Sequence, residues 1–273
     1  MDYSHQAPWA GLGQLFEGDA FRFQFHLRPA REGWLAAGQP PPATLEQRAT
    51  LLTTVRDRTL VWGEGADACW TALEPLLGDS LRDRAGDEGA PRERAARVSQ
   101  AWAPDFVLLR RAEEEFRFVG GSVCFPSAWD PVEKLGLTVT EVHGPVPGLN
   151  PELGTHIRRF LNGLRPGQVF ERQNWSLAAT GALDLHPGNA FPRIGRDTPM
   201  EAVWFRLEEQ AFVAFEESRS LLFLIHVRTW PLTEVLEATG ATVAFERMIR
   251  SMPPEMARYK GFGLWAEDFR SGA

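Results

Sequence analysis

Five short runs rich in valine, phenylalanine and leucine follow one another from Asp105 onward, and they constrain the fold more than any other feature of the sequence. Runs of this length and composition are typical of β-strands. Helical segments are expected between the second and the third run, around residues 129–135 and 151–164. The five expected strands are 106–110, 116–125, 169–177, 203–213 and 221–230.

The segments around these strands indicate a mixed α+β fold. Residues 1–39 are expected to form an irregular arm, and helical spacing of apolar residues predicts helices at 45–58 and 66–77. A last helix is expected at 233–252, where Pro253 and Pro254 follow. The sequence therefore predicts a PAS-like, five-stranded antiparallel sheet with inserted helices, covered on one face, behind a helical N-terminal arm.

A highly charged stretch separates the two halves of the chain. Residues 82–97 are almost only charged residues, Gly, Ala and Pro, so a solvated loop or the rim of a helix is expected there. This places an arm with packing helices at 1–100 and a PAS-like domain with a C-terminal helix at 101–273. Because 44% of the 273 residues are apolar, both parts are expected to form one compact unit.

Charge and motif content argue against several classes of function. The formal net charge is −7 and the basic residues are scattered, which argues against nucleic acid and anionic membranes as partners. The two cysteines lack a C-x-x-C spacing, and neither a G-x-G-x-x-G turn nor a P-loop occurs. No apolar run could span a bilayer and no targeting segment is visible in residues 1–9, so a cytoplasmic protein is expected.

One histidine lies in the most unusual segment of the chain. Prolines at 145 and 147 fix the backbone after His143, so the orientation of the ring is set before a ligand arrives. An axial heme ligand needs such a fixed orientation. A histidine of a surface or hydrogen-bonded loop is the alternative. Three other histidines are rival candidates, the first on the fifth strand and the others weaker: His226, His156 and His186.

Polar side chains alternate along the third and the fourth strand. Alternation places the members of each set on one face of the sheet. An ordinary solvated sheet face would show the same pattern, and this alternative stays open. Arg228 shares its face of the fifth strand with His226. The two alternating sets are Arg172, Asn174 and Ser176, and Arg206, Glu208 and Gln210.

Seven motifs then occur in order along the chain. They are Phe21-Arg22 with Leu27-Arg28-Pro29 and Trp34, Asp105-Phe106-Val107-Leu108-Leu109, the 124–129 segment with Lys134 and Gly136, His143-x-Pro145-Val146-Pro147, Arg172-x-Asn174-Trp175, Arg206-x-Glu208-x-Gln210, and Tyr259-Lys260-Gly261. In this order they resemble the heme-binding subunit of the heme-dependent oxidative N-demethylases. The resemblance covers nearly the whole chain.

The resemblance implies a PAS-like fold that binds heme b and oxidises a small methylated amine with O2, releasing formaldehyde. Electrons would come from a separate flavin and iron–sulfur reductase, since this chain has no flavin, nicotinamide or iron–sulfur motif of its own. His143 would be the heme iron ligand. A non-catalytic heme-binding sensor and a degenerate structural subunit are the alternatives, because a fold does not fix a function.

Roles for the site residues follow from this hypothesis. Glu208 is expected to hold the ammonium group of the substrate, because a buried carboxylate is costly without a cation. An internal salt bridge from Glu208 to Arg206 or Arg172 is the alternative. The residues expected to bind heme propionates or orient the ligand are Arg172, Asn174, Arg206 and Arg228. The aromatic residues expected to line the pocket are Phe125, Trp129, Trp175 and Trp204.

The stretch that begins at Glu208 departs from the family pattern. Family members usually carry an E-R-Q-T-L-R-R-L-P run there, whereas this chain reads E-E-Q-A-F-V-A-F-E over residues 208–216. Two or three positive charges are missing. If those cations pair with propionates or dock a reductase, this chain uses Arg172, Arg206 and Arg228 instead or has changed its partner.

Overall fold

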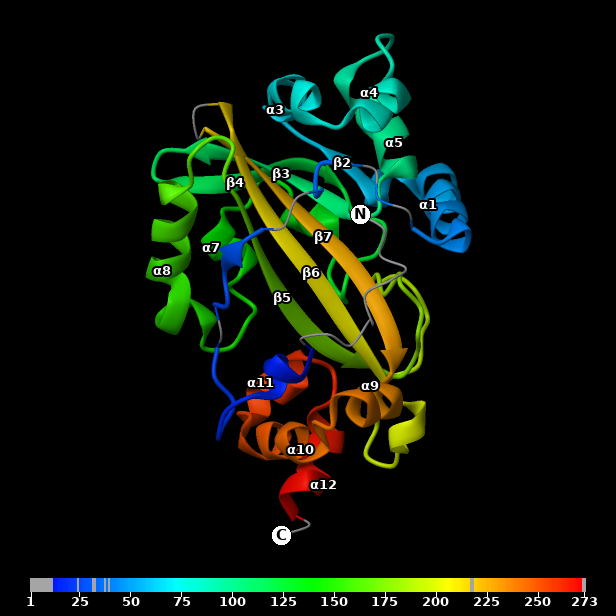
Figure 1. The fold of residues 1–273 in the computed structure, drawn as a ribbon, viewed down its shortest axis with the longest axis vertical. Coiled ribbons are helices and arrows are strands. Elements are labelled where there is room, and N and C mark those ends of the chain that lie inside the picture. Colours follow the sequence, from blue (N-terminus) through cyan, green and yellow to red (C-terminus); the bar gives the residue numbers. More distant parts are fainter. Residues whose placement is uncertain are drawn as a thin grey trace.

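One antiparallel sheet of seven strands organises the fold in the computed structural model (Figure 1). The structure describes residues 12–271 except 24, 31–32, 37, 39 and 217–218, so the expected absence of a targeting segment at the start of the chain lies outside it. None of the helices in this described part combines the length and the apolar character that crossing a membrane requires.

The sheet has two more strands than the sequence predicted. The five expected strands form as β3 to β7, but two short strands also pair at the edges, in the order β1-β5-β6-β7-β3-β4-β2. Stretches of two or three residues are too short to show alternation, so the sequence pattern missed them. The strands are β1 (Arg28–Pro29), β2 (Leu60–Trp62), β3 (Asp105–Ala112), β4 (Glu115–Ser122), β5 (Val169–Ala178), β6 (Trp204–Phe215) and β7 (Ser220–Pro231).

Helices precede, interrupt and follow the sheet. They are α1 (Pro42–Thr54), α2 (Arg56–Thr59), α3 (Ala66–Leu73), α4 (Asp79–Ala85), α5 (Pro91–Ala101), α6 (Pro131–Lys134), α7 (Val139–Val142), α8 (Leu149–Gly163), α9 (Leu232–Thr239), α10 (Thr242–Ser251), α11 (Pro254–Tyr259) and α12 (Gly263–Ser271). Short 3-10 helices lie at Leu12–Phe16, Glu74–Leu76 and Met200–Ala202.

Of the two alternatives for the charged stretch 82–97, the helical one is confirmed, since the stretch lies mostly within α4 and α5; Ala95 and Ala96 are nevertheless buried. Small apolar residues on one helix face are enough for this burial, and composition alone hides them. The expected helix 233–252 is broken at Gly240, whose φ of 63° ends α9. Pro254 then begins α11 instead of only ending the helix before it.

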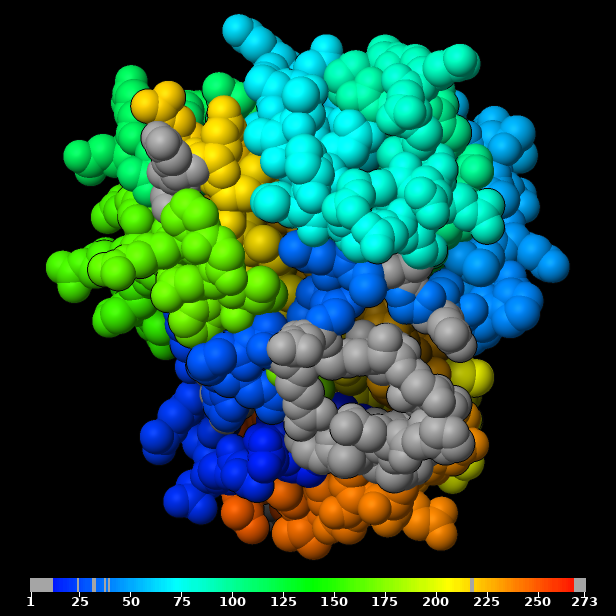
Figure 2. Space-filling view, turned by 45° about the horizontal axis from the view of Figure 1, so that its top comes forward, coloured from blue at the N-terminus to red at the C-terminus, as the bar shows by residue number. Residues whose placement is uncertain are grey.

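Helices cover both faces of the sheet, not one as the sequence predicted. We call the face that carries Arg172, Arg206 and Glu208 the site face. On the opposite face, α3–α5 form one core cluster with the sheet and α9–α12 form a second. On the site face, Leu161 of α8 belongs to a further cluster with Ala214 of β6. Figure 2 shows the surfaces of the first two groups, cyan and orange, at opposite ends of the molecule.

Candidate functional site

Glu208 lies buried in the middle of β6 and receives three hydrogen bonds from neutral groups. The hydroxyl of Ser127 donates to Oε1 at 2.5 Å, and the amides of Asn174 and Gln210 donate to Oε2 at 3.2 and 2.8 Å. Asn174 stands directly opposite Glu208 in the pairing of β5 with β6. Alternation in the sequence placed each set of polar residues on one face of its own strand, and the structure brings Asn174 of one set together with Glu208 of the other.

Arg206 is the nearest buried cation, yet it reaches Glu208 only through a hydroxyl group. Its Nε donates to Oγ of Ser127 at 2.7 Å, and the direct salt bridge considered from the sequence is not formed. Burial lowers the pKa of Arg206 to about 10, while the charge of Glu208 acts the other way. The other guanidinium nitrogens donate to backbone carbonyl groups, those of Phe125, Pro126, Ala182 and Leu183.

Arg172 is a second cation on the site face, and among the described residues no carboxylate lies within ion-pair distance of it. It lies opposite Gln210 in the sheet, and its buried Nε donates to no acceptor. Burial lowers the pKa of the guanidinium group, and the charge of Glu208 opposes this shift without coming to ion-pair distance. A buried guanidinium group with unused donors is suited to bind an anionic group.

His143 lies close enough to Arg172 for the two to interact electrostatically. Burial, followed by the charges of Arg172 and Lys134, lowers the pKa of His143 to about 4. The imidazole is therefore neutral at pH 7, which is the form that binds a metal ion. The backbone N–H of His143 donates to Val139, and its carbonyl accepts from Val146, so the end of α7 and the proline-rich turn hold the residue.

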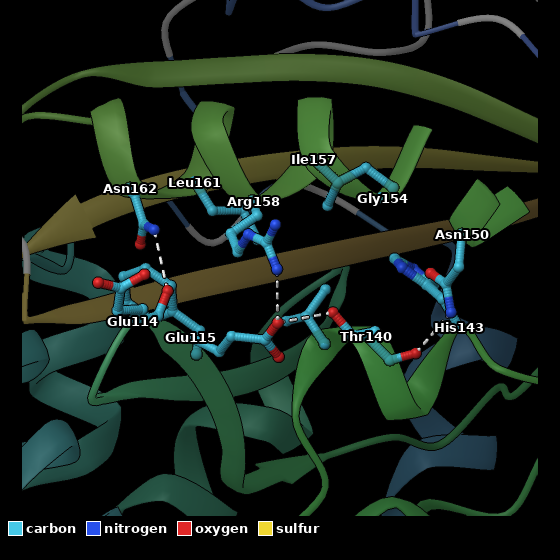
Figure 3. Close-up of a pocket in the computed structure, with 12 residues that line it drawn as sticks. Glu114, Glu115, Thr140, His143, Asn150, Gly154, Ile157, Arg158, Leu161 and Asn162 are labelled. Carbon is cyan, nitrogen blue, oxygen red and sulfur yellow. Dashed lines mark hydrogen bonds and ion pairs between the residues drawn. The ribbon is translucent and has the colours of Figure 1, made fainter. Parts of the chain in front are cut away.

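We call Glu208, Arg206, Arg172 and His143 the cluster. A small cavity beside His143 is separate from the other three residues (Figure 3). It lies between α8 and the start of β4, and its volume is about 10 Å³, which leaves room for about one water molecule. Its carboxylate, Glu115, already accepts a hydrogen bond from Thr140 at 2.9 Å and pairs with Arg158 at 3.4 Å. This cavity is too small to hold a porphyrin.

Two residues near the C-terminus complete the cluster. Lys260 donates to the carbonyl of Trp175 at 2.6 Å, and burial lowers its pKa to about 8 against the charge of Glu208. Tyr259 is 50% exposed, yet burial followed by the charge of Glu208 raises its pKa. The sequence contained this Tyr-Lys-Gly motif but gave no reason to place it beside Glu208.

Lys260 gives a testable pH dependence. The unfolded chain keeps this proton up to about 10.5, whereas the folded protein loses it near 8. Between these values the unfolded state binds more protons, so the free energy of unfolding rises with pH. From about pH 7 to about pH 9.5 the native protein should gain about 2 kcal/mol relative to Lys260→Met. Urea unfolding at both pH values measures this, and parallel changes in the two proteins would contradict it.

The cluster fits a b-type heme in three respects. His143 offers a neutral nitrogen donor, and Arg172 offers a cation for a propionate. Phe212 and Phe223 stack at 4.8 Å on the same face and stay partly exposed, which suits a flat apolar ring. Four site-face residues of β5 are partly exposed, namely Phe170, Arg172, Asn174 and Ser176. The polar residues beside them on β6 are buried, namely Arg206, Glu208 and Gln210.

Several residues proposed from the sequence lie on the opposite face. His226 and Arg228 approach Glu209 at 3.3 and 3.6 Å, so these three charges form a network away from Glu208. The ring of Trp175 stacks on Phe262 in the core formed with α9–α12. The structure therefore does not bring these side chains together with Glu208.

The remaining sequence candidates surround the cluster without forming its centre. Phe125 is buried beneath the guanidinium group of Arg48, and Trp129 packs with two core clusters of the site face. Trp204 lies close against Gly181. His186 is buried beside Arg58 and Asp130, and His156 is exposed on α8, so neither faces Glu208. The sequence missed Ser127, whose role depends on a contact across 81 residues.

A comparison with known families matches most of the chain to one family model. A family model described as "Haem-dependent oxidative N-demethylase, alpha subunit-like" matches residues 80–269, which is more than half of the chain. The matched range contains His143, Arg172, Glu208 and Lys260.

Proposed function

We propose a function for this chain, which belongs to the haem-dependent oxidative N-demethylase, alpha subunit-like family. It binds heme b on the site face and demethylates a small amine. The products would be the demethylated amine and formaldehyde, with O2 as the oxidant. The observation that carries the proposal is the buried carboxylate of Glu208, which three neutral donors hold while no side-chain cation contacts it directly.

His143 would hold the iron and Arg172 would bind a propionate. The low pKa of His143 leaves its ring neutral over the whole physiological range, so no proton competes with a metal. The unused Nε of Arg172 supplies the charge-assisted hydrogen bond that a propionate needs. When bound, heme supplies the activation of O2, which no side chain of a protein can provide.

Glu208 would bind the methylated ammonium group of the substrate. A buried carboxylate without a cation is costly, and a small ammonium ion would compensate its charge. Asn174 and Gln210 both bind Oε2 of Glu208, so the carboxylate cannot rotate freely. Burial of Glu208 strengthens its ionic contact with the amine.

A partner protein would supply the electrons. The name of the family, alpha subunit-like, implies a partner subunit. We propose that this partner is a flavin and iron–sulfur reductase, and we expect the complex to act in the cytoplasm. The sheet would correspond to a PAS-like fold. A non-catalytic heme sensor would share the heme site but would need no such partner.

The differences from the family sequence at residues 208–216 do not remove the cations of the proposed site. Val213 and Ala214, where the family run carries two arginines, are buried in the middle of the sheet. Glu209, at the position of the third arginine, faces away from Glu208 and pairs with Arg228. Arg172 and Arg206 remain on the site face, so the missing charges do not argue against a heme there.

A visible absorption spectrum tests the heme assignment. Protein from heme-supplemented cells should show a Soret band, and His143→Ala should lose or shift it because the iron loses its nitrogen ligand. His156→Ala is the matched control, since His156 lies exposed on α8. A Soret band that is unchanged in His143→Ala would exclude His143 as the ligand. Reductase-dependent release of formaldehyde from a methylated amine would then distinguish an enzyme from a sensor.

A further inference from the structure

Arg206, Ser127 and Glu208 form a buried chain of hydrogen bonds, in which each residue donates to the next. Nε of Arg206 donates to Oγ of Ser127 at 2.7 Å, and the same hydroxyl reaches Oε1 of Glu208 at 2.5 Å. Arg206 and Glu208 are both buried, and the hydroxyl is the sole side-chain link between their charges in the described part of the chain.

The direction of this chain follows from the chemistry of its members. A guanidinium group only donates, so Ser127 must accept from Arg206, and its single proton is left for Glu208. The contact between the hydroxyl of Ser127 and Oε1 of Glu208 is short, at 2.5 Å. Ser127 therefore links Glu208 to the charge of Arg206 and fixes the orientation of Oε1.

The backbone around Ser127 is fixed by two buried charges. Asp105 accepts the N–H groups of Cys124 and Phe125, both at 2.9 Å. Arg206 in turn donates to the carbonyl of Phe125 at 2.8 Å and to that of Pro126 at 3.3 Å. The segment before Ser127 is thus held through both its donors and its acceptors, so the position of the hydroxyl is set by the fold and not by a ligand.

We propose that Ser127 is a positioning residue, which holds the side chain of Glu208 in one orientation and so sets its affinity for the ammonium group of the substrate. The proposal rests on the proposed function, in which Glu208 binds the amine. Ser127 itself would touch neither the amine nor the heme. Its effect should therefore appear in substrate binding and not in the rate of the chemical step.

The test compares serine variants in the heme-loaded protein with dimethylammonium as the probe. Ser127→Ala should raise the Kd from calorimetry and the KM by about tenfold, because one charge-assisted hydrogen bond is lost, with kcat within about twofold. Ser127→Thr keeps the hydroxyl and should restore both values. Ser176→Ala is the matched control, since Ser176 lies partly exposed on the same face and makes no contact with Glu208.

The outcomes distinguish a failure of the proposed role of Ser127 from a failure of the proposed function, in which Glu208 binds the amine. If Ser127→Ala binds dimethylammonium like the native protein while Glu208→Gln does not, the role of Ser127 is wrong and that of Glu208 stands. If Glu208→Gln also binds normally, the proposed function fails. Should Ser127→Ala not fold, Ser127→Cys gives the decision, since its weak thiol donor should raise the Kd and unchanged binding would overturn the proposal.

Discussion

Replacing Glu208 by glutamine is expected to reduce kcat/KM for the methylated amine by about a hundredfold or more, with the Soret band unchanged. Glutamine keeps the shape but removes the charge, and truncating one partner of a buried charge pair costs about 2–5 kcal/mol. The three donors that now bind Glu208 are neutral groups, so they can rearrange around an amide. Steady-state kinetics with the reductase and a spectrum of the same sample measure both properties.

The adjacent residue supplies the control for this experiment. Glu209 carries the same charge on the same strand but points to the opposite face, toward His226 and Arg228. Glu209→Gln should leave the KM for the amine within about twofold, because the sheet separates it from the substrate. Equal losses in both variants would mean that the general charge of β6, and not a contact with Glu208, governs the affinity for the amine.

Replacing Asp105 by alanine is expected to lower the free energy of unfolding by about 3–5 kcal/mol, the cost of breaking a buried ion pair. Asp105 and Arg48 pair at 2.9 Å, and each side chain is only 1% exposed. The variant would also leave the N–H groups of Cys124 and Phe125 without an acceptor. Burial already raises the pKa of Asp105 despite Arg48, which shows how unfavourable one isolated charge would be here. Urea unfolding at pH 7 measures the loss.

An exposed ion pair provides the comparison for Asp105. Glu93 pairs with Arg56 at 2.7 Å, but half of its side chain is exposed. Glu93→Ala should therefore cost less than about 1 kcal/mol. If Asp105→Ala cost no more than that, the pair with Arg48 would not fix the segment before Ser127. A charge-free pair, Arg48→Met with Asp105→Leu, should recover part of the loss because neither partner is left alone.

The sequence predicted the long elements of the sheet because their patterns are local. Alternation identified β3 to β7 and placed Arg206, Glu208 and Gln210 on one face, as the contacts with Asn174 confirm. The edge strands β1 and β2 were missed because two or three residues carry no period. Coverage of both faces was also missed, since the sequence pattern does not show against which face of the sheet the buried residues of α3–α5 pack, such as Trp70, Leu73 and Leu81.

The chemical detail of the cluster could not be predicted from local patterns. The bond between Ser127 and Glu208 joins residues that are 81 positions apart, and Lys260 reaches Trp175 across 85 positions. Alternation already placed Trp175 and Glu208 on different faces. The assignment of Trp175 to the pocket came from the family resemblance, and the structure places the ring of Trp175 in the core of the opposite face.

The placement of two neighbouring glutamates on opposite faces of β6 has an evolutionary consequence. A single inserted or deleted residue in this strand would turn Glu208 toward Arg228 and bring Glu209 in front of Ser127, with every apolar neighbour displaced as well. Length changes in β6 should therefore be purged by selection.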